Sequence, residues 1–304
     1  LLKTYPSSAL VSNMLGVVFM AQDKPTQALA AYENTVKKNP DYPDVYNNLG
    51  ILLNSLGQFD EAIDKFAKAV QLDPDFGDAL NNLGAMLQNL NQHEQALTHL
   101  SRAVTLNPRS PLAYFNYANS LKATDRKDAA LENYDRAINL HPSFSLAFNN
   151  RGNLLESMAR YEESSRSFTR AIELDPGYAR AYSSRGSVEE KLGNYSRARR
   201  DFSRAVDLDP WRPENPKQDS NFKFRLYINL GDIQMYFKEF EKALATYDRA
   251  AEIEPNNLDV AGFRGNALAA LGNLCEGLQL RQESFGLVSF DISNGVSIIH
   301  GRVK

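Results

Sequence analysis

Asparagine side chains recur at a fixed interval along this chain. A carboxamide carries N–H donors and a C=O acceptor, so a row of them can pair with the main chain of an extended polypeptide. Asparagine costs about 0.6 kcal/mol relative to alanine inside a helix, so its repeated use indicates a purpose beyond solubility. The row has a spacing of 34 residues, shifted by 11 before its last member, and consists of Asn48, Asn82, Asn116, Asn150 and Asn229, with Asn119 and Asn153 three residues after two of them.

The residues that usually carry catalysis are few and scattered. The chain has four histidines and one cysteine, Cys275, and it contains no HExxH, Walker, GxGxxG or GxSxG motif. His93 and His99 are six residues apart, so they do not share a helical face. The sequence therefore predicts no catalytic residue, no metal site and no cofactor, and we expect that the chain is not itself an enzyme.

Composition narrows the classes of partner. The net charge of −3 and the isoelectric point near 5.9 give no general attraction to nucleic acid. No apolar run approaches the roughly 20 residues that a membrane helix requires. We expect a soluble protein in the cytoplasm by default, and the first residue, Leu1, indicates a piece of a longer chain.

Small residues mark a repeating unit. Within one unit, Tyr46, Leu49, Gly50 and Leu53 fall on one face of a predicted helix, and Gly57 follows where a left-handed residue would end it. A second helix is predicted to follow and to close at a proline. The small residue of the first helix recurs at Gly16, Gly50, Gly84, Ala118, Gly152, Gly186, Gly231 and Gly265. The proline after the second helix recurs at Pro40, Pro74, Pro108, Pro142, Pro176, Pro210 and Pro255.

This pattern resembles the tetratricopeptide repeat (TPR), which shares the 34-residue helix–turn–helix period. The resemblance implies an all-α fold, a right-handed superhelix of about eight helix pairs whose first helices line a concave groove. The repeat style is also similar to the TPR array of O-linked N-acetylglucosamine transferase, in which an asparagine ladder holds peptide main chain. The positions that match this ladder are Asn48, Asn82, Asn116 and Asn150.

The repeats divide the chain as follows. Residues 1–8 are interpreted as the tail of a missing preceding repeat, and residues 9–284 as the array, with repeats starting near 9, 43, 77, 111, 145, 179, 224 and 258. Residues 213–223 form an insertion, either a surface loop or a joint. Residues 285–304 form a C-terminal tail in which Asn294-Gly295 between alternating apolar residues indicates a short β-hairpin, either a cap or the start of a further domain.

The predicted groove residues are Asn48, Asn82, Asn116, Asn119, Asn150, Asn153, Arg180 and Asn229. Arg180 belongs to a more basic later half that would suit an acidic segment. A carboxylate clamp of the kind found in TPR co-chaperones is not expected, because Phe115 and Ser184 replace two of its cations.

The leading hypothesis is a protein–protein interaction scaffold that binds an extended polypeptide. The alternative for the asparagines is that they hydrogen-bond one another. The alternatives for the chain are the targeting or substrate-recognition arm of a larger enzyme, such as a glycosyltransferase, and a self-assembly scaffold.

Overall fold

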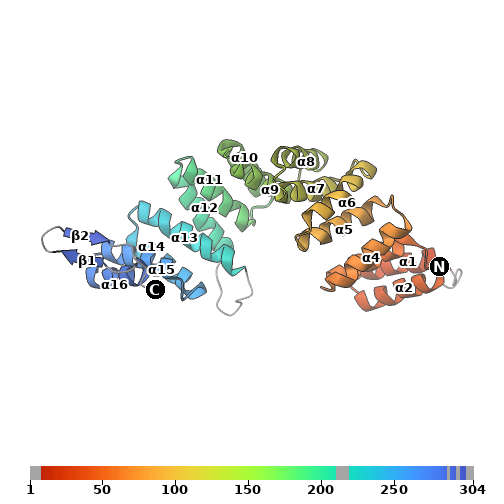
Figure 1. Ribbon diagram of the computed structural model, residues 1–304, viewed down its shortest axis with the longest axis horizontal. Coiled ribbons are helices and arrows are strands. Elements are labelled where there is room, and N and C mark those ends of the chain that lie inside the picture. Colours follow the sequence, from red (N-terminus) through yellow and green to blue (C-terminus); the bar gives the residue numbers. More distant parts are fainter. Residues whose placement is uncertain (1–7, 210–218, 286–287, 292–294, 299–304) are drawn as a thin grey trace. The chain divides into compact units, whose positions relative to one another are not determined.

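The computed structural model describes residues 8–209, 219–285, 288–291 and 295–298, and within these the chain is almost wholly helical (Figure 1). The predicted tail of a preceding repeat, residues 1–7, and most of the predicted insertion lie outside the described residues. By the clustering of Cα atoms the chain forms two compact units, 1–154 and 155–304, and the division falls inside one helix.

The helices alternate as first and second members of antiparallel pairs. The first helices are α1 (Ala9–Ala21), α3 (Pro43–Ser55), α5 (Gly77–Asn89), α7 (Pro111–Ala123), α9 (Ser145–Ser157), α11 (Ala179–Lys191), α13 (Ser220–Tyr236) and α15 (Leu258–Ala270). The second helices are α2 (Pro25–Lys38), α4 (Phe59–Leu72), α6 (His93–Leu106), α8 (Lys127–Leu140), α10 (Tyr161–Leu174), α12 (Tyr195–Leu208), α14 (Phe240–Ile253) and α16 (Leu274–Phe285).

All eight described pairs turn through one left-handed residue. Gly57, Gly193 and Gly272 have φ between 77° and 89°, and Gly57 is the residue at which the sequence predicted this conformation. Asn91 and Asp125 adopt the same region. The same turn is made by Asp23, Ala159 and Lys238 in the other repeats, with φ of 55°, 56° and 59°.

The two helices of a pair meet at the repeated glycine. A Cβ atom on Gly50 would lie 2.6 Å from Cε1 of Phe66, whose side chain is 2% exposed. The absence of a side chain on the first helix therefore lets the second helix lay a large side chain flat against it. The same contact recurs at Gly16 with Tyr32, Gly84 with Leu100, Gly186 with Phe202 and Gly231 with Tyr247.

Helix α13 begins earlier than the repeat pattern predicts. Residues 220–223, which were assigned to the insertion, form its first turn, and the side chain of Asp219 accepts a hydrogen bond from the N–H of Phe222 at 3.1 Å. Lys223 is 1% exposed, and its Nζ lies 2.6 Å from Oδ1 of Asp209 at the end of α12. The cap and this ion pair between a buried lysine and a partly exposed aspartate explain why the helix extends beyond the predicted start.

Two short strands follow the last helix. The strand β1 (Val288–Asp291) pairs antiparallel with β2 (Gly295–Ile298), with Phe290 opposite Val296. Residue Asn294, part of the predicted hairpin turn, lies outside the described residues.

Candidate functional site

The asparagines of the predicted row lie at the sixth and ninth positions of the repeats. We call the side of the first helices that carries the second, sixth and ninth positions the first-helix face. It is exposed at the second position of α7 and α9, whereas Asn116, at the sixth position of α7, is only 7% exposed. The exposed fractions of Leu112 and Leu146, at the second position of α7 and α9, are 48% and 44%. Because α7 and α9 carry asparagines four and seven residues after these leucines, each helix presents the same order of leucine, amide and amide.

Most of the amides in the row donate to an amide of the preceding repeat. Nδ2 of Asn82 lies 2.9 Å from Oδ1 of Asn47. The equivalent bonds join Asn48 to Asn13 and Asn116 to Asn81, each at 3.0 Å. The alternative interpretation of the sequence, that these amides bond one another, therefore holds for one N–H each of Asn48, Asn82 and Asn116.

The pairing changes at the fourth repeat. Phe115 stands where the preceding repeats carry the accepting asparagine, and it packs on Phe144 with ring centroids 4.9 Å apart. Asn150 donates instead to Oδ1 of Asn119, at 3.0 Å, four residues further along α7. Asn149 is left with its Oδ1 buried and without a hydrogen-bond partner.

A hydrogen bond from the buried Tyr134 fixes the orientation of the Asn119 side chain. The hydroxyl of Tyr134 donates to Oδ1 of Asn119 at 2.5 Å, and burial raises the pKa of Tyr134, which keeps this donor protonated. Both lone pairs of Oδ1 are thus used, and the Nδ2 group of Asn119 donates to no residue in the described part of the chain. Asn153, half-buried one turn beyond Asn150, has no protein partner among the described residues.

The amides of the second and third repeats also keep part of their capacity. In the described part of the chain, Oδ1 of Asn48 and Oδ1 of Asn82 accept no hydrogen bond, and each residue is only half-buried. Each amide therefore combines one bond that fixes its orientation with an acceptor and an N–H that remain available.

The two predicted residues of the second unit are placed differently. Arg180 forms an ion pair with Asp219 and lies over the ring of Phe222, 4.7 Å from the centroid, so it is not a free cation. Asn229 lines a hollow of about 210 Å³ between α13 and α15. The hollow is walled by Phe224, Ile228 and Phe263, with Arg225, Asn257 and Asp259 at its polar side.

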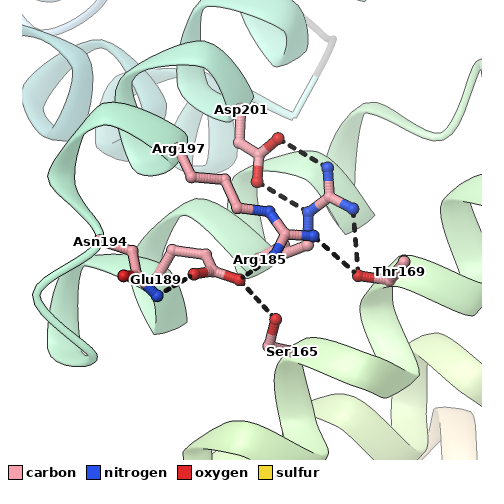
Figure 2. A network of polar contacts seen from close by, with 7 residues as sticks. All are labelled: Ser165, Thr169, Arg185, Glu189, Asn194, Arg197 and Asp201. Atoms are coloured by element: carbon pink, nitrogen blue, oxygen red, sulfur yellow. Dashed lines mark hydrogen bonds and ion pairs between the residues drawn. The ribbon is translucent and has the colours of Figure 1, made fainter.

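A network of charged side chains lies between α10, α11 and α12 (Figure 2). Glu189 is 1% exposed, and its carboxylate accepts from Ser165 at 2.5 Å, from Asn194 at 2.7 Å and from Arg197 at 2.9 Å. Burial of this charge is therefore compensated on every side.

The second carboxylate of the network belongs to Asp201, whose side chain is 5% exposed. It takes two parallel bonds of 2.7 Å from Arg185, and Arg185 also donates to Oγ1 of Thr169 at 3.1 Å. In the fifth and eighth repeats the corresponding arginines reach an aspartate 16 residues earlier, Arg151 to Asp135 and Arg264 to Asp248. In the sixth repeat Thr169 stands in the place of that aspartate, so Asp201 supplies the carboxylate that pairs with Arg185.

No cluster of three or more potential metal-binding His, Cys, Asp or Glu side chains occurs in the described part of the chain. None of the described helices is long and apolar enough to cross a bilayer. Cys275 is exposed.

Comparison with known families agrees with the helix pairing. Family models described as tetratricopeptide repeat match residues 13–75 and 149–213, residues 77–110, and residues 112–144 and 224–257. The chain belongs to the tetratricopeptide repeat family. A comparison with curated protein sequences found no match.

Solved TPR structures resemble the chain in fold. The APC/C hetero-tetramer Cut9–Hcn1 gives a TM-score of 0.67 at 18% identity, over 88% of this chain and 51% of the other. Pseudomonas aeruginosa PilF gives 0.63 at 18% identity, over 74% of this chain and 97% of the other. YrrB, described as a TPR protein with an unusual peptide-binding site, gives 0.50 at 22% identity, over 59% and 93%.

Sequence reasoning missed the network of Figure 2. The signal that could have found it lies in α10, where Ser165 is buried at a position that α6 and α8 fill with Leu97 and Leu131. The small polar side chain leaves room for Glu189, to which Ser165 donates a hydrogen bond.

Proposed function

We propose that this TPR array is a protein-interaction scaffold that holds an extended polypeptide along the first-helix face of residues 9–154. The observation that supports the proposal is that amides of the asparagine row use only part of their hydrogen-bonding capacity within the protein. Each sixth-position amide of the second and third repeats is oriented by a neighbour and still offers a donor and an acceptor. Side-chain amides held in this way match the alternating N–H and C=O groups of a main chain.

Fixed orientation favours binding. A free asparagine side chain loses rotamer freedom when a guest orders it, and this ordering costs about 0.5–1.5 kcal/mol for a rotamer-rich side chain. The bond between Asn82 and Asn47 imposes that order before a guest arrives. The leucines at the second position of α7 and α9 supply apolar contact on the helices that carry Asn119 and Asn153, whereas Asp44 and Asp78 hold this position on α3 and α5. A guest with an apolar side chain near its contacts with α7 and α9 fits this face.

The proposal is tested with a library of peptides displayed on phage and selected on the full chain. Asn153→Ala and Asn82→Ala are expected to weaken the selected peptides by about fivefold each, since each removes hydrogen bonds worth about 1 kcal/mol. Gln71→Ala, an exposed change on α4, is the matched control. Selected peptides that bind both asparagine variants as tightly as the unaltered chain would exclude the amide row as their site.

A second candidate function, self-assembly, is favoured by α1. Leu10, Met14, Val17 and Val18 lie on one side of this helix, and each is between 47% and 56% exposed. Stripes of this kind pair readily with a second copy. Sedimentation of the chain and of a Val18→Glu variant over a range of concentrations distinguishes the two: a monomer in both cases removes this candidate.

A further inference from the structure

The second helices of the fifth and sixth repeats enclose a cleft that the first-helix face does not include. It lies between α10 and α12, has a volume of about 380 Å³, and is lined by Ser165, Arg166, Thr169, Arg170, Glu173 and Arg197. Three of these six residues are arginines and one is an acid. Three of the lining residues, Ser165, Thr169 and Arg197, belong to the network in Figure 2.

Thr169, in the lining of the cleft, has a hydroxyl proton for which the described residues provide no acceptor. Oγ1 of Thr169 accepts from Arg185 at 3.1 Å and from Arg197 at 3.2 Å, which occupies both of its lone pairs. No acceptor for its own O–H occurs among the described residues. Since Thr169 lines the cleft, its hydroxyl is left as a donor for a group bound there.

The same network fixes Arg197. One terminal nitrogen of its guanidinium contacts Glu189 at 2.9 Å and the other contacts Thr169. A guanidinium carries five N–H donors in a planar fork, so donors remain after these contacts. Buried Glu189 thus holds Arg197 in one orientation at the edge of the cleft.

The remaining cations are available on the opposite wall. Arg166 is exposed and has no partner among the described residues. Arg170 pairs with Glu173 at 2.9 Å, but the two side chains are 48% and 56% exposed. An exposed pair of this kind contributes about 0–1 kcal/mol, so a stronger anion displaces Glu173 easily.

We propose that the cleft between α10 and α12 binds the phosphoryl group of a phosphorylated serine or threonine in a polypeptide partner. A phosphoryl group carries about −1.5 to −2 charges and three acceptor oxygens, which matches three guanidinium groups and one hydroxyl better than a single carboxylate does. None of the described residues that line the cleft is aromatic, so none of them stacks on a nucleobase. Its volume is also near the small end of the range for ligand pockets, about 300 Å³, which suits a side chain rather than a nucleotide.

The test is fluorescence anisotropy of the full chain with two labelled peptide libraries that share a fixed central residue, phosphoserine in one and serine in the other. The phosphoserine library is expected to bind about tenfold more tightly at low ionic strength. Arg166→Ala should remove most of that preference. Glu173→Gln should increase it, because the substitution releases Arg170 and removes the opposing charge.

Two controls separate the cleft from general attraction and from the first-helix face. Arg109→Ala removes an exposed arginine elsewhere and should change the affinity by less than about twofold. Asn82→Ala should leave the phosphoserine preference intact, so failure here and failure of the peptide-binding face are distinguishable. Inorganic phosphate is expected to compete with the phosphoserine library and to lose that ability with Arg166→Ala.

Three results would overturn the proposal. The first is equal binding of both libraries, and the second is a preference that Arg109→Ala reduces as much as Arg166→Ala does. The third is competition by inorganic phosphate without any advantage for the phosphoserine library, which would exclude a polypeptide partner.

Discussion

The hydrogen bond between Asn82 and Asn47 predicts an unequal pair of mutants. Asn47 is 7% exposed, whereas Asn82 is half-buried. Asn82→Ala strands the buried Oδ1 of Asn47, which costs about 1–3 kcal/mol. The alanine regains about 0.6 kcal/mol of helix propensity. We therefore expect a net loss of about 1–2 kcal/mol in the free energy of unfolding.

The reverse substitution is expected to cost less. Asn47→Ala removes the same bond but leaves an N–H that water can reach, so a loss of about 1 kcal/mol is largely offset by propensity. In the double variant no group is stranded, and its stability should be close to that of the unaltered chain. The bond between Asn116 and Asn81 serves as an internal control: both residues are 7% exposed, so their single variants should be equally destabilised.

The assay is urea unfolding followed by circular dichroism, with hydrogen exchange of the amides in α3 and α5 as the local measurement. The reasoning is refuted if Asn47→Ala costs as much as Asn82→Ala, or if the double variant is less stable than both single variants. Either result would mean that the amide pair has stabilising contacts beyond its one hydrogen bond.

Three other expectations concern the second unit. Ala159→Gly should stabilise the chain by about 1 kcal/mol in thermal unfolding, because it relieves a left-handed alanine. Glu189→Gln should lower the free energy of unfolding in urea by about 2 kcal/mol. This loss is smaller than that for breaking a fully buried ion pair, because the side chain of Arg197 is 40% exposed and water can solvate its charge. The pKa of Asp219 is lowered, first by the N–H of Phe222 and then by its arginine partner. The stabilisation by Asp219 is therefore present above an ordinary aspartate pKa of about 3.9 and is lost as the pH falls through the lowered value. Exchange of the Phe222 amide should accelerate in that range.

The period of the sequence was sufficient to predict the helix pairs, because glycine and a large partner such as Phe66 impose one geometry on each pair. It was not sufficient for Ala159 and Lys238. Neither residue favours a left-handed turn, and the packing of the flanking helices imposes it.

The candidate site stays a prediction, and the pattern of its hydrogen bonds could not be predicted at all. Periodicity predicts that the amides share one side of the first helices, and Leu112, four residues before Asn116, is 48% exposed. Which amide donates to which depends on rotamers and on distances between repeats, and a sequence pattern contains neither. Arg180 shows the same limit, because its partner Asp219 lies 39 residues away in a segment with no repeat pattern.

The substitution of Phe115 for asparagine has a consequence for any guest that follows the amides. The acceptor moves by four residues between the third and fourth repeats, which is about 6 Å along α7 at 1.5 Å per residue. The donors Asn116 and Asn150 both keep the sixth position of their repeats, so only the internal acceptor shifts. A guest that follows the sixth-position amides would therefore keep one spacing across this point. What changes beside it is the surface of α7, where the aromatic ring of Phe115 takes the place of an amide.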